Sequence, residues 1–253
     1  FSIMAKTYQK TKLQEVTIKG YKSIAFNRPV TLKLNDVSIL LGANGAGKSN
    51  IISFFRMLSY MMSKSFGKYV EMSGTSNALL HYGTKKTPVM SGEIKFSDSK
   101  SIDTYSFSLS NATPDRLIIT EERIVWHRKG KVKPYEVTLE PVFKESALAE
   151  SDNPVAKTIF QMLSYCKVYQ FHDSSVEGPL RQVCPVETTN YLQSHGNNLP
   201  SFLLFLRDNY INSYNRIVDY VRDVVPQFQD FYLEPNNRFV SLRWMDNSAT
   251  DYR

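Results

Sequence analysis

The chain has 253 residues, of which 42% are hydrophobic and 22% are charged, and it carries a net charge of +7. This composition excludes a disordered chain, and no apolar run approaches the roughly 18 residues that a membrane span needs. We therefore expect a soluble, cytoplasmic protein with no membrane partner. The positive charge suits a phosphate-rich ligand such as a nucleotide or nucleic acid, although many soluble proteins with this balance bind neither.

The chain has two cysteines, Cys166 and Cys184, and no Cys-x-x-Cys pair. Such sparse use of cysteine is typical of an intracellular protein with free thiols. The four histidines lack the spacing of zinc ligands, so we expect no zinc site. Residues 1–12 are expected to be a tail or a cloning remnant, in which Met4 is the natural initiator.

Two short strands are expected near the start of the chain. Residues 13–18 and 30–34 alternate apolar and polar side chains, as strands with one exposed face do. Residues 37–41 form an apolar, β-branched run, which predicts a buried parallel strand. Beyond residue 49, apolar residues recur at helical spacing as far as Met62, which predicts a helix.

A phosphate-binding motif lies between this predicted parallel strand and this helix. The pattern G-x-x-x-x-G-K-[ST] is matched by Gly42, Ala43, Asn44, Gly45, Ala46, Gly47, Lys48 and Ser49. The glycines let the backbone approach an anion, on which N–H groups and the positive end of the helix dipole converge. Lys48 is expected to reach the β- and γ-phosphates of ATP as the catalytic residue, and Ser49 to bind Mg²⁺. The alternative is a glycine-rich turn that binds no nucleotide.

The order of these elements resembles the opening of a known class of ATPases. The residues I-K-G-Y-K-S (18–23), a second strand, and V-S-I-L-L-G-A-N-G-A-G-K-S-N-I (37–51) are similar to the start of ABC-type ATPase heads of the RecF, SMC and OLD class. Asn44 and Asn50 match the class pattern N-G-x-G-K-S-N, which places Asn50 among the expected nucleotide-binding residues. The resemblance also implies that Lys22 and Ser23 lie near the nucleotide. Otherwise they are solvated turn residues.

Residues 63–90 are rich in serine and glycine, and are expected to form a connection with one short helix at 76–80. Four strands are expected after this connection, because each run is short, alternating and bounded by turn residues. They span residues 91–96, 104–109, 117–126 and 135–139. The pattern predicts an antiparallel meander, which ABC-type heads also carry. In the third strand, Thr120 stands where an ATPase would have its metal-binding Asp, so we interpret this run as a hairpin strand.

A helix at 155–163 and a strand at 167–171 are expected next. Residues 168–181 are similar to the segment "YHFHDTS…P-RR" of a large bacterial family of predicted ATPases with an ABC-type head. In ABC proteins a glutamine after a strand at this place touches Mg²⁺ or the attacking water, so the resemblance implies that Gln170 is a metal contact. The alternative is a polar turn that Gln170, His172 and Asp173 build together.

Two helices and a hairpin are expected at the end of the chain. An asparagine N-cap followed by Pro200 predicts a helix over 201–210, and a second helix over 213–225. Residues 231–234 and 239–244 are expected to form a hairpin around a Pro-Asn-Asn turn. The fold class expected is mixed α/β. Its domains would be a P-loop lobe with a β meander at 13–165 and a helical lobe with a terminal hairpin at 166–253.

The resemblance implies an ABC-type head whose C-terminal part lies outside this sequence. In the class, the signature helix and the catalytic acid follow such a hairpin, and neither pattern occurs within residues 1–253. Without these groups a P-loop binds nucleotide but hydrolyses it poorly. We therefore expect the sequence to be part of a longer ATPase, with the acid and signature beyond residue 253. The alternative is a degenerate nucleotide sensor.

The leading functional hypothesis is a Mg²⁺-dependent ATPase that forms a homodimer or higher homo-oligomer around ATP and regulates a nuclease or another DNA-processing partner. The chain resembles the ATPase components of Septu-type and retron-linked anti-phage defence systems. The second hypothesis is a nucleotide-gated scaffold that holds a toxin or nuclease with little turnover. A conventional P-loop kinase is disfavoured by the two leading strands and the meander. DNA or RNA is a further candidate ligand, although the mixed charges on the last two helices favour a solvated face.

Overall fold

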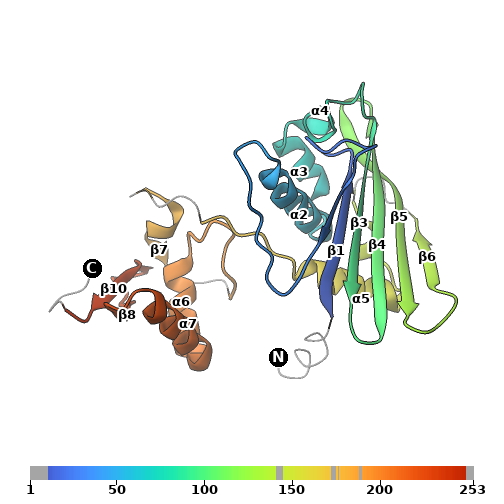
Figure 1. The fold of residues 1–253 in the computed structure, drawn as a ribbon. Coiled ribbons are helices and arrows are strands. Elements are labelled where there is room, and N and C mark those ends of the chain that lie inside the picture. Colours follow the sequence, from blue (N-terminus) through green and yellow to red (C-terminus); the bar gives the residue numbers. More distant parts are fainter. Residues whose placement is uncertain (1–10, 141–144, 172–174, 176, 188–189, 249–253) are drawn as a thin grey trace. The chain divides into compact units, whose positions relative to one another are not determined.

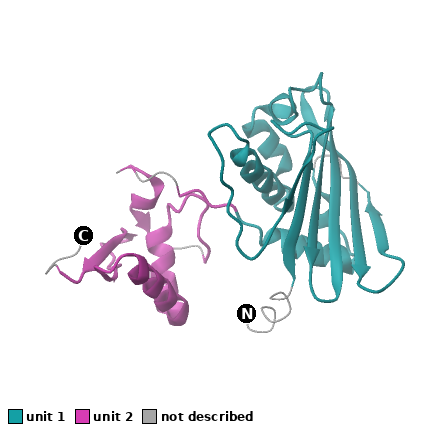
Figure 2. Cartoon of the chain, viewed as in Figure 1, with its two compact units in different colours: residues 1–167 teal, residues 168–253 magenta. Residues whose placement is uncertain are grey.

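The computed structural model describes residues 11–140, 145–171, 175, 177–187 and 190–248. The chain forms two compact units, which divide between Lys167 and Val168 (Figure 2). The sequence places this division between residues 165 and 166. The expected mixture of helices and strands is confirmed. Within the described residues, no helix combines the length and apolar character that crossing a bilayer requires.

Unit 1 is built on a six-stranded antiparallel sheet with the order β2-β1-β3-β4-β5-β6 (Figure 1). The strands are β1 (Lys12–Lys19), β2 (Val30–Lys33), β3 (Val89–Ser97), β4 (Ser101–Ala112), β5 (Arg116–Arg128) and β6 (Tyr135–Leu139). Their side chains alternate between buried and more exposed positions, most regularly in β3 and β4. The alternation that predicts the four-stranded meander is therefore confirmed, and β1 extends it by pairing with β3.

Helices cover one face of this sheet (Figure 1). They are α2 (Lys48–Met62), α3 (Phe66–Met72), α4 (Thr75–Leu79) and α5 (Pro154–Ser164), with a short 3-10 turn η1 (Ala147–Ala149). Their apolar residues and those of the inner sheet face form one core. Helices α2, α4 and α5 agree with the sequence-based expectation. Helix α3 was missed, although Phe66, Tyr69 and Val70 have helical spacing and are buried.

A glycine in the centre of the sheet lets helix α2 pack closely. An added Cβ at Gly92 of β3 would lie 2.5 Å from Phe107 Cζ and 2.8 Å from Phe54 Cζ. The Phe54 ring of α2 stacks on the Phe107 ring of β4 with 6.1 Å between centroids and 15° between planes. Strand, helix and neighbouring strand therefore meet at a position where only a glycine fits.

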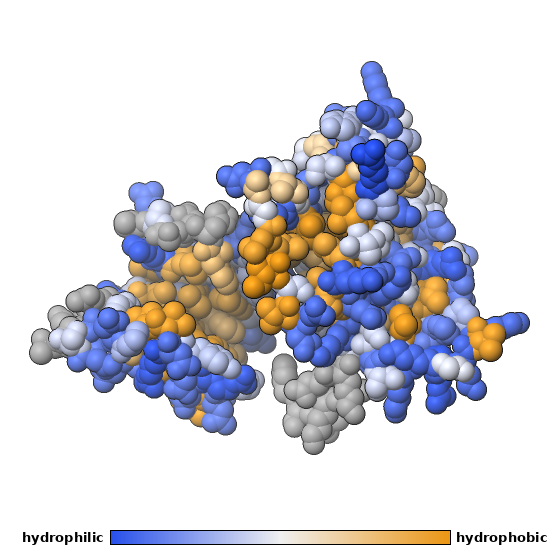
Figure 3. Space-filling model, in the orientation of Figure 1, coloured by the Kyte–Doolittle hydropathy of each residue, from blue (hydrophilic) through white to orange (hydrophobic). Residues whose placement is uncertain are grey.

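The predicted parallel strand at residues 37–41 is wrong. This segment has no regular secondary structure, and the side chains of Val37, Ile39 and Leu41 are 79%, 77% and 88% exposed. Figure 3 shows hydrophobic residues on the surface over this segment of unit 1. The physical reason is that the sheet ends at β2 on this side, so an apolar segment finds no strand to pair with among the described residues.

Unit 2 has a separate small core. Its elements are a 3-10 turn η2 (Pro179–Arg181), β7 (Cys184–Pro185), α6 (Leu199–Asn209), α7 (Ile211–Val224), β8 (Phe228–Tyr232), β9 (Phe239–Val240) and β10 (Arg243–Asp246). The two expected helices are confirmed. Both cysteines are free thiols, as expected, and Cys184 is buried with its sulfur 2.7 Å from Ser201 Oγ.

Three expectations for unit 2 need correction. Residues 167–171 are not a strand; Gln170 N instead donates to Ser194 O at 2.8 Å. In the expected hairpin, β8 pairs with β10, whereas β9 pairs with β7. Asn198 is the N-cap residue of α6, but its side chain makes no cap hydrogen bond, because it bridges Gln193 N and Tyr191 O. His172 and Asp173 of the expected polar turn lie outside the described residues.

Candidate functional site: a phosphate-binding loop at the start of α2

The glycine-rich loop at residues 42–49 leads directly into helix α2. Gly45 and Gly47 have φ of 85° and 91°, a left-handed conformation that glycine adopts without steric cost. Ala46 N donates to Ala43 O at 3.2 Å, which closes a turn, and Gly47 is the N-cap residue of α2. The N–H groups in the first turn of a helix have no partner within it, so they face outward with the positive end of the helix dipole. The loop therefore has the form of an anion cradle.

Lys48 lies over this loop. Its Nζ donates to Gly42 O at 2.6 Å and to Ala43 O at 2.8 Å. The ammonium group is therefore held at the mouth of the loop, where the predicted phosphates would bind. Ser49 follows it in the first turn of α2, the position from which its hydroxyl is expected to bind Mg²⁺.

The turn after β1 contacts the loop. Asn50 Nδ2 donates to Ser23 Oγ at 2.7 Å, and an added Cβ at Gly47 would lie 3.3 Å from the same oxygen. Residues separated by more than twenty positions are thus brought together beside the loop. Asn50 contacts Ser23 in this arrangement, so it positions the turn against the loop. The predicted contacts of Asn50, Lys22 and Ser23 with nucleotide stay predictions.

Lys22 adds positive charge at this turn. Its backbone has φ of 49°, and its N–H donates to Leu79 O at 2.8 Å. Burial lowers the pKa of the Lys22 ammonium group, and the nearby Arg56 guanidinium lowers it further. Arg56 of α2 therefore adds positive charge near Lys22.

A buried hydroxyl network fixes the turn to the helices. Tyr21 is fully buried, and its hydroxyl lies 3.0 Å from both Ser53 Oγ of α2 and Tyr69 Oη of α3. Tyr69 Oη also donates to Ser53 O at 3.0 Å. Sequence reasoning did not find these residues, because a tyrosine in a turn or a helix gives no signal of its distant partners.

Carboxylates are absent from the contacts of the loop in the described structure. Lys48 and Asn50 bond only to carbonyl and hydroxyl oxygens there, and the described residues contain no group of three or more His, Cys, Asp or Glu side chains suited to a metal ion. Gln170, the second expected Mg²⁺ contact, belongs to unit 2, and its approach to Ser49 stays a prediction. The residues present therefore fit phosphates, whereas for Mg²⁺ they offer the Ser49 hydroxyl alone.

Glu122 is part of the hydrogen-bonded interior of unit 1. Residues 117–122 are an apolar run followed by two acids, and a bulge opposite Ser108 and Leu109 turns Glu122 into the core while Glu121 stays exposed. Glu122 is fully buried and accepts hydrogen bonds from the hydroxyl of Tyr105, from Ser146 Oγ at 2.5 Å and from Ala147 N at 2.6 Å. The interpretation of this run as a hairpin strand is confirmed.

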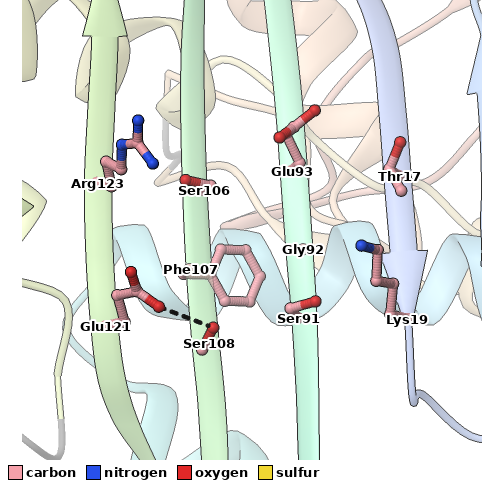
Figure 4. Close-up of a pocket in the computed structure, with 10 residues that line it drawn as sticks. All are labelled: Thr17, Lys19, Ser91, Gly92, Glu93, Ser106, Phe107, Ser108, Glu121 and Arg123. Carbon is pink, nitrogen blue, oxygen red and sulfur yellow. Dashed lines mark hydrogen bonds between the residues drawn. The ribbon is translucent and has the colours of Figure 1, made fainter. Parts of the chain in front are cut away.

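A shallow pocket of about 230 Å³ lies on the outer face of the sheet (Figure 4). Side chains of opposite charge line it, with Lys19 and Arg123 beside Glu93 and Glu121. Ser108 Oγ donates to Glu121 Oε2 at 3.4 Å, and Arg123 also pairs with Glu136. These charges are balanced within the sheet face, so the pocket has less anion-binding character than the glycine-rich loop.

Comparison of the sequence with protein-family models and with curated proteins finds no match. The assignment of a function therefore rests on the motif, on the geometry around it and on the resemblance in the order of its elements.

Proposed function

We propose that this chain binds ATP with Mg²⁺ through residues 42–49. The observation that carries the proposal is the left-handed backbone of Gly45 and Gly47 at the N-terminus of α2, with Lys48 Nζ held across the loop. Backbone N–H groups, the helix dipole and a lysine then act on the same phosphates. The proximity of Ser23 to Gly47 supports the same function, because it supplies a hydroxyl at the rim of the loop.

The wider proposal is an ABC-type ATPase head of the RecF, SMC and OLD class. The resemblance of residues 18–23 and 37–51 to this class supports it, as does an antiparallel sheet in the same unit as the loop. In this proposal ATP joins two or more copies of the chain, and the assembly regulates a nuclease or other DNA-processing partner in anti-phage defence. DNA or RNA would be a further ligand.

The exposed segment at residues 37–41 indicates what such a head still needs. Val37, Ile39 and Leu40 are all apolar, and all three are exposed to solvent. A strand that is apolar on both faces is stable only in the interior of a sheet covered on both sides. We propose that further strands, from another part of a longer protein or from a partner chain, complete a sheet here and bring the missing acid to Ser49.

A nucleotide-gated scaffold is the second candidate. The lack of a carboxylate contact at the loop in the described structure favours it, because hydrolysis requires an acid to hold Mg²⁺ and orient the attacking water. The two candidates differ in turnover. Release of phosphate in excess of the protein would favour the ATPase, and binding with less than one turnover would favour the scaffold.

The P-loop proposal is tested by the variant Lys48→Ala. Isothermal titration calorimetry with Mg·ATP should show a loss of affinity of about a hundredfold or more, because the variant lacks a charged donor to the phosphates. The matched control is Lys157→Ala, since Lys157 is an exposed lysine of the same unit that pairs with Asp152. Equal affinities in wild type and Lys48→Ala would refute the proposal.

A further inference from the structure

The loop between α4 and β3 folds onto the turn that contacts the P-loop. His81 N donates to Gly20 O at 3.0 Å, and His81 Nδ1 lies 2.7 Å from Lys22 O. The bond from Lys22 N to Leu79 O holds the same two segments together on the other side. Because Ser23 of this turn also contacts Gly47 and Asn50, residues 79–82 are tied to the glycine-rich loop through a single intervening turn.

Tyr82 presents its ring to solvent from this fixed position. The side chain is 76% exposed, so it gains little from burial. Its backbone has φ of 53°, in the left-handed region that is sterically unfavourable for a residue with a side chain. Gly83 follows with φ of 84°, and Thr84 N donates to Asn77 Oδ1 at 3.2 Å. The surrounding bonds therefore hold a large aromatic ring outward in an unfavourable conformation.

The Tyr82 side chain is contacted by two neighbours, and its 76% exposure leaves the rest of the ring open to a flat ligand. The His81 ring contacts it edge-on, with centroids 4.3 Å apart and planes at 60°. Lys86 Nζ lies 4.9 Å from the Tyr82 centroid. An exposed aromatic ring beside a cation is an arrangement that proteins use to stack a nucleobase while attracting its phosphates.

We propose that Tyr82 stacks on the base of the nucleotide whose phosphates bind at residues 42–49. This inference rests on the proposed nucleotide binding and adds to it the contact that recognises the base. Phosphates at Lys48 and a base at Tyr82 would place the ribose beside Lys22 and Ser23, the turn that joins the two sites. The ligand is therefore a nucleoside triphosphate. The contact with Tyr82 would make the site bind it more tightly than inorganic polyphosphate, which has no base.

The experiment compares Mg·ATP with inorganic tripolyphosphate, which carries the phosphates without the base. Calorimetry on the full chain should show that Tyr82→Ala weakens ATP binding about five- to hundredfold, the effect of losing one base–aromatic stack. Binding of tripolyphosphate should be unchanged, and Tyr82→Phe, which keeps the ring, should keep ATP affinity. Tyr220→Ala is the matched control, because Tyr220 is 63% exposed and lies in unit 2.

The outcomes separate this inference from the P-loop proposal. If wild type binds neither ATP nor tripolyphosphate, both proposals fail. If wild type binds both ligands and Tyr82→Ala changes neither affinity, or lowers both equally with an unchanged circular dichroism spectrum, base stacking alone is refuted. Base stacking is also refuted if Tyr82→Ala weakens binding of a single-stranded oligonucleotide and leaves ATP unaffected, which would assign the ring to nucleic acid.

Discussion

Strand β3 and residues 37–41 both have strand-like sequences, yet their environments in unit 1 are opposite. In β3, Met90 and Ile94 are fully buried and the backbone pairs with β1 on one side and β4 on the other. In residues 37–41, Ile39 and Leu41 are 77% and 88% exposed and no strand pairs with them among the described residues. The difference shows that suitable side chains make a strand possible, but that a strand forms only where neighbouring strands are available to pair with it.

The two sides of the P-loop differ in the same way, because one side is packed against other elements and the other is exposed. On its helix side the loop is held by α2, by the Asn50–Ser23 bond and by the buried hydroxyl of Tyr21. On its strand side it continues into the exposed residues 37–41. The glycine-rich loop is therefore held by packing and hydrogen bonds on its helix side, whereas its strand side is exposed in the described structure.

The test of this comparison with the largest expected effect removes one large apolar side chain from each region. Phe54→Ala should lower the free energy of unfolding of unit 1 by about 3–5 kcal/mol, because it leaves a cavity against Tyr21 and Phe107. Leu41→Ala should change it by no more than about 0.5 kcal/mol, as exposed positions do. Urea unfolding followed by Trp126 fluorescence in a Trp244→Phe background reports on unit 1 alone.

The result for Leu41→Ala decides the comparison. A loss of stability similar to that of Phe54→Ala would mean that residues 37–41 are packed in solution, and the proposed completion of the sheet from elsewhere would lose its support.

A second test compares two adjacent acids within the sheet. Glu122→Ala should cost about 2–4 kcal/mol, because the hydroxyls of Tyr105 and Ser146 and the N–H of Ala147 would lose a buried acceptor. Glu121→Ala, one residue before on the exposed face, should stay within about 0.5 kcal/mol. The same urea assay measures both variants. Equal effects would contradict the register shift at the bulge, which puts Glu122 and not Glu121 on the buried face.

The smallest expected effect concerns a weak point in the buried face. Asp103 of β4 is 6% exposed and its Oδ1 has no hydrogen-bond partner in the described structure. Burial, and secondarily the Asp98 carboxylate, raises the pKa of Asp103 to about 6. Since the folded state holds this proton more tightly than the unfolded chain, Asp103 weakens stability progressively as the pH rises from about 4 to above 6.

The variant Asp103→Asn should therefore stabilise unit 1 by about 1–2 kcal/mol at pH 7.5 and by nothing near pH 4. Thermal unfolding across this pH range measures the effect. Asp36→Asn is the control, because Asp36 is exposed and pairs with Lys12. A gain for Asp103→Asn that is independent of pH would show that the ionisation of Asp103 is not the cause.

Much of unit 1 could be predicted because its strands alternate strictly. The runs at 91–96 and 135–139 carry both their period and their turn residues in the sequence, so local information is enough. The predictions of strands at residues 37–41 and 167–171 were wrong for one reason. Each segment has strand-like side chains, but whether a strand forms depends on a pairing partner, which the sequence of the segment does not specify. Helix α3 was missed because serines and a glycine around Phe66 indicated a loop, whereas core contacts of Tyr69 and Val70 stabilise a helix.

The candidate site was predictable in part for a similar reason. Residues 42–49 form a contiguous motif, so their loop could be found from the sequence. The approach of Ser23 to Gly47 was expected only from the resemblance, and the position of Tyr82 was not expected at all. Its place depends on the bonds of His81 to Gly20 and Lys22, which join segments some sixty residues apart in the sequence.

Gly92 fixes the position of helix α2, and with it the glycine-rich loop, on the sheet. Because Phe54 of α2 rests over the bare backbone of Gly92, the helix cannot slide along the sheet without driving its ring into neighbouring side chains. This packing fixes the start of α2 relative to the turn after β1, which contains Ser23. The absence of a side chain at Gly92 thus determines where the N-terminus of α2, and with it the candidate site, lies relative to the sheet.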